Sequence, residues 1–282
     1  MAGVSASLVK ELRERTGLGM MDCKKALVEA EGDIDAAIEN LRKSSGMKAA
    51  KKAGRIASDG LLGNRVEGAK GVIVEVNCET DFAAKDDNFK AFVKTVTDTV
   101  FETGNSDVAT LGLDDTRDAL VQKIGEKVSI RRADVFESAG HVVDYIHTNG
   151  KLGVMLSMEG GDEALGRDIA MHIAAMNPAV VSAEDAPADL VATEREIYTA
   201  QAQDSGKPPE IIEKMIEGRI KKYLAEISLL EQAFVKDGDI KVGALLKKEG
   251  ATIHRFVRME VGEGIEKAEE DFAAEVARQL ES

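Results

Sequence analysis

The chain has no tryptophan, only two cysteines, and aromatic residues make up just 4% of its 282 positions. Few aromatic rings leave little surface for stacking on nucleic-acid bases. Cys23 and Cys78 lie far apart at positions expected to face a core, so we expect buried, reduced thiols rather than a disulfide. Apolar runs of 18 residues are also missing, and the charged amphipathic start MAGVSASLVKELRER does not resemble a signal peptide. These absences predict a cytoplasmic protein with no membrane partner.

Positive charge is in short supply as well. The sequence holds 51 acidic and 37 basic residues, which gives a formal net charge of −14. Sequence-independent binding of nucleic acid depends on neutralising phosphates with lysine and arginine. We therefore do not expect nucleic acid to be the main partner.

Catalytic and ligand-binding motifs are absent too. The sequence contains no GxxxxGK[ST] phosphate loop, no complete GxGxxG fingerprint and no GxSxG. Its histidines, which show no metal-ligand spacing with one another or with the cysteines, are His141, His147, His172 and His254. His172 lies between apolar residues of an expected helix and is interpreted as a structural imidazole. We expect no enzyme, no metal site and no cofactor, and we favour a protein that binds another protein.

What is present begins with three short helices in residues 1–45. Apolar residues recur at helical spacing in each of them, and the three stripes comprise Leu8, Val9 and Leu12; Cys23, Ala26, Leu27 and Ala30; and Ile34, Ala37, Ile38 and Leu41. Gly17 is expected to end the first helix in a left-handed conformation, Gly32 the second, and Asp33 to cap the third. Each helix spans two or three turns, so the three require mutual packing and predict a compact bundle.

Two features of this region have two interpretations each. Met20 and Met21, in an expected loop, either plug the bundle or form an adaptable contact surface. Residues 42–55, RKSSGMKAAKKAGR, carry six positive charges and no acid. They are either a solvated linker or frayed helix, or an electrostatic arm for an acidic partner.

From residue 61 the pattern changes to alternation typical of strands. Residues 61–77 predict a hairpin turning near Gly68, followed by a helix and by a strand at 127–137. The apolar face of that helix comprises Phe89, Phe92, Val93, Val96 and Val100. The same order returns as a hairpin over 144–158 turning at Asn149-Gly150, a helix and a strand at 253–261. The inward residues of this second helix are expected to be Leu165, Ile169, Ile173 and Met176. We infer two related subdomains with a repeated β-β-α-β order.

An insertion interrupts the second copy. Leu190, Val191, Ile197 and Tyr198 predict one helix, and a second, starting at Pro209, carries the stripe Ile212, Ile216, Ile220, Tyr223 and Ile227. The pair predicts a projecting antiparallel helical hairpin. The chain end predicts an amphipathic helix, with Ile265, Phe272, Val276 and Leu280 apolar, that folds back or docks on a partner.

These elements predict an α+β fold of five parts. Residues 1–55 form the helical bundle with its basic linker, and residues 56–140 form the first core subdomain. Residues 141–180 with 229–263 form the second core subdomain. The hairpin takes residues 181–228, and a helical module takes residues 264–282.

Three long stretches carry a resemblance to a known family. SLVKELRERTGLGMMDCKKAL, VEVNCETDFAAKDD and FVRMEVGEGIEKAEEDFAAEV resemble segments of bacterial translation elongation factor Ts. The resemblance covers essentially the whole chain. It implies a ubiquitin-associated-like fold for the first bundle. It also implies a guanine-nucleotide exchange factor that has no chemistry of its own and drives GDP release from elongation factor Tu.

The resemblance also implies a site. Within the segment Thr80, Asp81, Phe82 and Ala83, the Asp-Phe pair matches the element that enters between two helices of the partner's G domain and displaces its Mg²⁺. By spacing alone, Phe82 precedes Phe89 by seven residues, so a helix running through both would bury it in this protein's own core. The family often has valine where this chain has Ala83, which bears on how the loop is supported.

Further roles carry over from the same family. Arg13, Met20 and Met21 match positions that grip a helix of the partner G domain, and His147 matches a histidine near the intruding pair. The 181–228 hairpin matches a module implicated in self-association or further contacts. Two rivals stay open: an adaptor that binds through residues 1–45, and an RNA-binding chaperone that works through residues 42–55.

Overall fold

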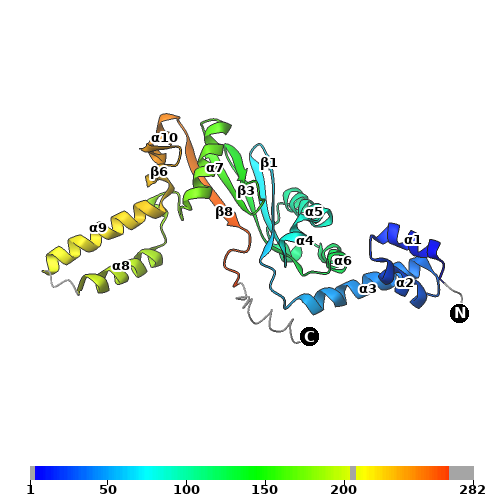
Figure 1. Ribbon diagram of the computed structural model, residues 1–282. Coiled ribbons are helices and arrows are strands. Elements are labelled where there is room, and N and C mark those ends of the chain that lie inside the picture. Colours follow the sequence, from blue (N-terminus) through cyan, green and yellow to red (C-terminus); the bar gives the residue numbers. More distant parts are fainter. Residues whose placement is uncertain (1–3, 204–207, 267–282) are drawn as a thin grey trace. The chain divides into compact units, whose positions relative to one another are not determined.

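The computed structural model describes residues 4–203 and 208–266 and is a mixed helix and sheet structure, so the predicted α+β class is confirmed (Figure 1). The chain divides into two compact units, which are described separately below. Among the described residues, the first comprises 4–63, 74–133 and 260–266, and the second comprises 64–73, 134–203 and 208–259. Within the described residues, every helix is too short or too polar to span a membrane.

The first unit begins with α1 (Ala6–Thr16), α2 (Met20–Glu29) and α3 (Ile34–Lys52). Local sequence signals set their ends. Ser5 and Asp33 accept backbone hydrogen bonds as amino-terminal caps, and Gly17 ends α1 at φ 67°. The buried core of the bundle contains Val9, Leu12, Leu18, Cys23, Ala26, Leu27, Ala37 and Leu41. Cys23 and Cys78 are both buried, and among the described residues no disulfide joins them, as predicted.

The third helix is longer than expected. It continues through the predicted linker to Lys52, so the expectation of two or three turns is wrong for α3. The reason is tertiary packing, since α3 lies against α6 (Asp114–Ile124) and buries Ser45. Lys52 Nζ donates to the carbonyl of Gly125 just beyond α6. Five of the six basic residues, all except Arg55, therefore lie on an ordered helix, which favours neither a solvated linker nor a free arm.

A sheet with the strand order β1-β2-β3 follows. It comprises β1 (Asp59–Glu67), β2 (Lys70–Cys78) and β3 (Val128–Glu137), and Gly68 forms the predicted turn at φ 61°. The helical segments between β2 and β3 are α4 (Asp81–Lys85), α5 (Asp87–Thr103), the single turn η1 (Val108–Thr110) and α6. The predicted apolar face of α5 is buried throughout. The sequence analysis did not predict α6.

Strand β2 is buried on both faces. Glu75 and Asn77 are as inaccessible as the valines that alternate with them. The Glu75 carboxylate accepts hydrogen bonds from Arg131, Arg132, Asn77 and the Gly262 amide, at 3.0, 2.6, 3.0 and 2.8 Å. Every oxygen of this buried charge is thus compensated, as burial of a carboxylate requires.

The second unit contains the sheet order β4-β5-β8. Strands β4 (His141–Ile146) and β5 (Leu152–Glu159) are antiparallel, with register from His141 opposite Met158 to Ile146 opposite Gly153. The helix α7 (Glu163–Met176) precedes a long excursion that returns as β8 (Thr252–Glu260). The order strand, strand, helix, strand therefore occurs twice in the chain.

The prediction that Met176 of α7 faces inward is wrong. Met176 is 46% exposed, because it is the last helical residue and Asn177 turns the chain away in the left-handed region. His172 is buried as a structural imidazole, as predicted. One ring nitrogen lies 2.9 Å from Gln232 Oε1 and the other accepts from the Val235 amide at 3.1 Å. Burial lowers the pKa of His172, which favours the neutral ring.

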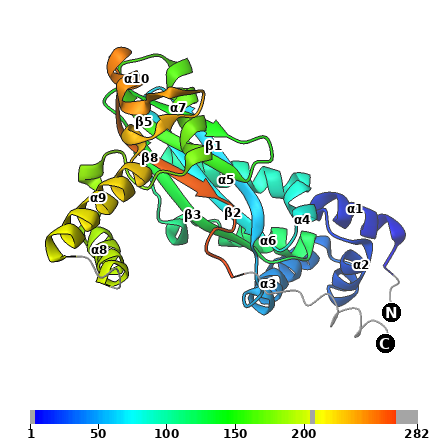
Figure 2. The same ribbon diagram turned by 60° about the vertical axis from the view of Figure 1, so that its left-hand side comes forward.

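The excursion contains the helical pair α8 (Ala188–Gln203) and α9 (Pro209–Ile227), which run side by side in both views (Figure 1, Figure 2). Pro209 occupies the first turn of α9, as predicted. Ile216 and Ile220 pack on Ala202, whereas Leu190 and Ile197 are exposed although the apolar stripe included them.

Four elements between α9 and β8 were not predicted. They are the single turn η3 (Leu229–Glu231), β6 (Ala233–Phe234), β7 (Asp237–Lys241) and α10 (Val242–Lys248). A second single turn, η2 (Ala183–Asp185), precedes α8. Most of the predicted 264–282 module, including Phe272, Val276 and Leu280, lies outside the described residues. The predicted domain boundaries stay a prediction.

Candidate functional site

The short helix α4 begins immediately after the buried strand β2. Thr80 caps it, because its hydroxyl accepts the amide hydrogen of Ala83 at 3.2 Å. Asp81 occupies the first turn, where a negative charge interacts favourably with the helix dipole. Its carboxylate pairs with Lys85 Nζ at 2.6 Å across one helical turn. The sequence therefore forms a well-terminated helix of only five residues.

One side of this helix is buried and the other is exposed to solvent. Ala83 and Ala84 are buried, whereas Phe82 is 80% exposed and is the most exposed large apolar side chain of the described residues. The Lys85 ammonium lies 5.7 Å from the Phe82 ring centroid. The interpretation of Phe82 as a residue of this protein's own core is therefore wrong.

A break in helical phase explains the error. Asp86 adopts extended backbone angles, φ −63° and ψ 136°, which end α4 before α5 begins. Its carboxylate then accepts from the amides of Asn88 and Phe89 at the start of α5. Phe82 and Phe89 consequently belong to different helices, and the spacing of seven residues has no structural meaning.

Three of the other predicted site residues lie on the amino-terminal bundle. Arg13 is exposed on α1, and Met20 and Met21 occupy the first turn of α2 at 58% and 75% exposure. Neither methionine plugs the bundle, since Leu18 is the buried residue of that connection. The two thioethers are available as a contact surface.

His147 belongs to the second unit. It follows β4 at the turn that leads to β5, and its side chain is exposed. Its Nδ1 lies 2.9 Å from the Tyr145 hydroxyl, and the two rings are tilted with centroids 6.3 Å apart. The Tyr145 contact orients the imidazole from within the same unit. The predicted site residues thus comprise Thr80–Ala83 in sequence, three residues on the bundle, and His147 in the other unit.

Glu79, Glu126 and Lys127 surround the start of α4 and were not predicted. Glu126 accepts hydrogen bonds from the Glu79 and Thr80 amides, and Glu79 accepts from the Lys127 amide. Glu79 could have been predicted as part of this region, because it directly precedes Thr80 in the sequence. No sequence signal connects Glu126 to the loop, because 46 positions separate it from Thr80.

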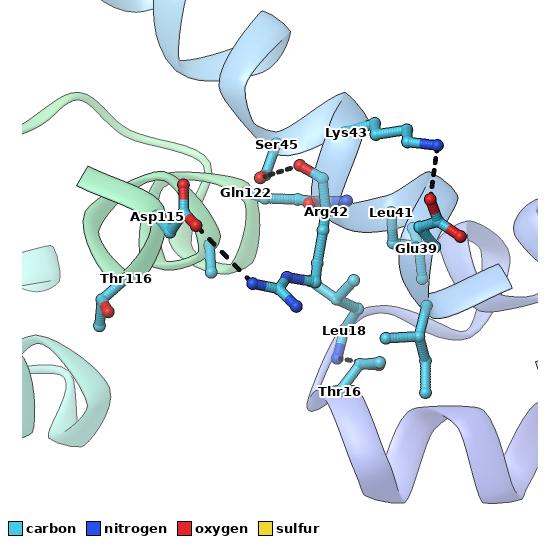
Figure 3. A pocket seen from close by; sticks show the side chains of 12 residues that line it. Thr16, Leu18, Glu39, Leu41, Arg42, Lys43, Ser45, Asp115, Thr116 and Gln122 are labelled. Carbon is cyan, nitrogen blue, oxygen red and sulfur yellow. Dashed lines mark hydrogen bonds and ion pairs between the residues drawn. The ribbon is translucent and has the colours of Figure 1, made fainter. Parts of the chain in front are cut away.

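One cavity of the first unit does not coincide with the predicted site. A cavity of about 680 Å³ in the first unit lies between α3 and α6, and none of the predicted site residues lines it (Figure 3). Arg42 points into it toward Asp115, 3.7 Å away, and Lys43 pairs with Glu39 on its rim. Across the described residues, no group of three or more histidine, cysteine and acidic side chains could hold a metal ion.

Comparison with known proteins gives the family. A model of the family described as Elongation factor TS matches residues 79–263. The Elongation factor Ts of Hahella chejuensis is 60% identical over 285 residues, covering 99% of each chain. That of Teredinibacter turnerae is 58% identical over 284 residues, covering 98% of this chain and 97% of its own. That of Saccharophagus degradans is 58% identical over 283 residues and 98% of each chain.

An α+β body with an anchored, exposed aromatic residue and matches of this extent defines a protein of the translation elongation factor class. The chain belongs, more narrowly, to the elongation factor Ts family. The family model covers more than half of its length, and the relatives align with nearly all of it.

Proposed function

We propose that this protein is a guanine-nucleotide exchange factor that binds elongation factor Tu in its GDP form and promotes GDP release during translation elongation. The observation that carries the proposal is the exposure of Phe82 on a helix anchored by Ala83 and Ala84. A large apolar side chain held away from its own core is suited to enter a partner. Family membership supplies the identity of that partner.

In the proposed mechanism, Phe82 enters between two helices of the partner's G domain, beside the bound Mg²⁺. Mg²⁺ requires nearly ideal octahedral geometry, so a small displacement of its ligands releases the ion. The diphosphate then loses a compensating charge. If the phosphate-binding loop also moves, the backbone amides that hold the phosphates are withdrawn. Asp81 brings a carboxylate close to the same site.

Other residues hold the two proteins together in this proposal. Arg13, Met20 and Met21 grip a helix of the G domain, and the exposure of both methionines supports that role. His147 contributes from the second unit, where Tyr145 orients its ring. Ala83, the next residue along α4, is buried, which supports a role in fixing how the exposed Phe82 side chain, the proposed wedge, is presented.

The energies are of the right size. Burying a phenylalanine side chain contributes about 1.5–3 kcal/mol, and each tenfold change in affinity corresponds to about 1.4 kcal/mol. If the ring is buried only when the nucleotide site is disturbed, Phe82 supplies one or two powers of ten in nucleotide release. Loss of Mg²⁺ and movement of the phosphate loop supply the remainder.

The proposal needs no catalytic group or cofactor of the protein's own. It places the protein in the cytoplasm, with another protein rather than nucleic acid as its main partner. We also propose that the 181–228 hairpin mediates self-association, which the exposed Leu190, Ile197 and Ile211 support.

The test is release of fluorescent GDP from elongation factor Tu in the presence of excess unlabelled GDP. Substoichiometric amounts of this protein should accelerate release strongly. Phe82→Ala should reduce that acceleration at least about tenfold, from the burial lost, and leave the fold intact because the side chain is exposed.

Val235→Ala is the matched control, since Val235 is a half-exposed apolar residue in the second unit. It should retain full activity. Absence of acceleration by the unaltered protein would refute the exchange function. Full activity of a folded Phe82→Ala variant would remove Phe82 from the mechanism.

A further inference from the structure

One carboxylate holds the backbone that leads into α4. Glu126 follows Gly125, the left-handed residue that ends α6. Its Oε2 accepts hydrogen bonds from the amides of Glu79 and Thr80, at 3.1 and 3.0 Å. Its Oε1 accepts from the Thr80 hydroxyl at 2.7 Å. A single side chain thus receives three donors from the two residues that immediately precede Asp81 and Phe82.

A side chain of the 79–80 segment likewise accepts a hydrogen bond from the backbone beside Glu126. Glu79 accepts a hydrogen bond from the Lys127 amide at 2.6 Å, and Arg55 donates to both of its oxygens at 3.3 Å. The Lys127 ammonium in turn donates to the Arg55 carbonyl at 2.8 Å. The segments 79–80 and 126–127 are therefore fastened by reciprocal bonds between side chain and backbone. Hydrogen bonds of this kind that involve an ionised acceptor are stronger than neutral ones.

Glu126 also determines how the Thr80 hydroxyl, which caps α4, is used in hydrogen bonding. A threonine hydroxyl has one hydrogen to donate and two lone pairs that accept. Because Glu126 takes the hydrogen of Thr80, a lone pair of the same oxygen is left to receive the Ala83 amide at 3.2 Å. Phe82 lies between the two residues that this chain of bonds connects.

Such support matters because α4 cannot order itself. A helix of five residues is too short to be stable in isolation. The exposed Phe82 ring adds little packing on its own protein. A wedge that is disordered before binding must lose conformational entropy in the complex, whereas a prearranged wedge does not.

We propose that Glu126 is a positioning residue for the wedge, which it holds in the direction needed to enter the partner. This inference rests on the proposed exchange function and adds to it a residue that acts only through Phe82. Glu126 itself need not touch elongation factor Tu.

Glu126→Ala removes all three accepted hydrogen bonds. Acceleration of GDP release should fall about tenfold, equivalent to about 1.4 kcal/mol. Glu126→Gln should stay within about threefold of the unaltered protein, because its amide oxygen still accepts the two backbone donors and its NH₂ can donate to Thr80 Oγ1. Glu126→Asp keeps the charge but is one methylene too short, so it should resemble Glu126→Ala. It decides the question if the alanine variant does not fold.

Glu231→Ala is a matched control, because it removes a glutamate whose carboxylate pairs with Lys241 at 2.6 Å in the second unit. Its exchange activity should be unchanged. Loss of activity in this control equal to that of Glu126→Ala would mean that any lost carboxylate has the effect, and would overturn the proposal.

Dependence on Phe82 separates positioning from general stability. In a Phe82→Ala background, Glu126→Ala should cause no further loss of exchange activity, because the wedge is already missing. If the double variant instead loses activity by the product of the two single losses, Glu126 acts independently of Phe82, which would overturn the proposal.

Hydrogen exchange of the free protein tests the geometry without the partner. Glu126→Ala should speed exchange of the Glu79 and Thr80 amides and leave those of α5 unchanged. Unchanged protection at 79–80, or full activity of folded Glu126→Ala and Glu126→Asp variants, would refute the positioning role. If the unaltered protein fails to release GDP, the exchange function fails instead, while this measurement still reports whether Glu126 holds the loop.

Discussion

Phe82 shows what spacing in a sequence can and cannot predict. Its distance from Phe89 suggested one continuous helix, but Asp86 interrupts it with an extended conformation and caps the next helix. The signal was present in the sequence, since the Asp86-Asp87 pair lies between the two phenylalanines and aspartate favours helix starts. The direction of Phe82 was decided by a capping residue rather than by hydrophobic periodicity.

Glu75 is a residue whose role no pattern predicted, because a buried charge within an apolar strand contradicts the binary pattern. Desolvation, the largest effect, raises the pKa of its carboxyl. The hydrogen bonds from Gly262, Asn77, Arg131 and Arg132 together outweigh it and hold the pKa below its ordinary value. The ionised form is therefore the one that stabilises the fold.

Glu75→Gln should lower the free energy of unfolding at neutral pH by about 3 kcal/mol, since two arginines lose a buried partner. The sign follows from the lowered pKa. The stabilisation is fully present above the pKa of an unfolded glutamate, about 4.3, and is lost as the pH falls through the folded value. Urea unfolding should show a large difference from the unaltered protein at pH 7 that shrinks below about pH 4.

The exposed Glu39, whose carboxylate pairs with Lys43 at 2.7 Å, provides the comparison. Glu39→Gln should change stability little, because exposed ion pairs contribute little. An equal loss at pH 7 and at low pH in Glu75→Gln would contradict the role of ionisation.

At the scale of elements, local signals were sufficient where one residue decides the backbone. The hairpin turns at Gly68 and Gly150 adopt positive φ values of 61° and 69°, and Asp33 and Pro209 start helices as predicted. Elements that depend on packing against distant parts of the chain were not predicted from the sequence. Helix α6 buries only Leu120 and Val121, so its sequence carries little periodicity, and its N-cap residue, Leu113, provides no side-chain cap.

The same packing explains why α3 continues beyond residue 45. Gly46 lies inside α3, and a methyl group added there would meet only Asp118 Oδ2, at an ordinary 3.5 Å. Gly46→Ala should therefore stabilise the protein by about 0.5–1 kcal/mol through helix propensity. The measurement is the urea midpoint followed by circular dichroism.

Gly17→Ala is the opposing control. Gly17 has φ 67°, so alanine there should destabilise by about 1–2 kcal/mol. An unchanged midpoint in Gly46→Ala would mean that residues 42–52 behave as a linker after all.

At the scale of the molecule, the family resemblance brought the eight predicted site residues together as one site, and periodicity alone could not assemble them. Arg13 and Phe82 lie in one unit and His147 in the other. In the proposed function they act together only in the complex with elongation factor Tu. Sequence patterns report local backbone and burial, whereas a surface for a partner leaves no periodic trace.

An exchange factor of this kind must obey a reciprocal relation. If the exchange factor lowers the affinity of elongation factor Tu for GDP by a certain ratio, GDP lowers the affinity of elongation factor Tu for the exchange factor by the same ratio. We expect titration calorimetry to give a higher affinity for nucleotide-free elongation factor Tu than for the GDP form. The ratio should equal the loss of GDP affinity in the complex. Phe82→Ala should reduce both ratios together by at least about tenfold, from the area of one buried ring.

The Val235→Ala variant should leave both ratios unchanged, since Val235 lies outside the proposed contacts. A Phe82→Ala variant that binds both forms more weakly by one common factor would show that the ring only adds affinity. Phe82 would then serve as an anchor, because a contact made equally in both states cannot shift the nucleotide equilibrium. Only a change in the ratio makes it the residue that drives release.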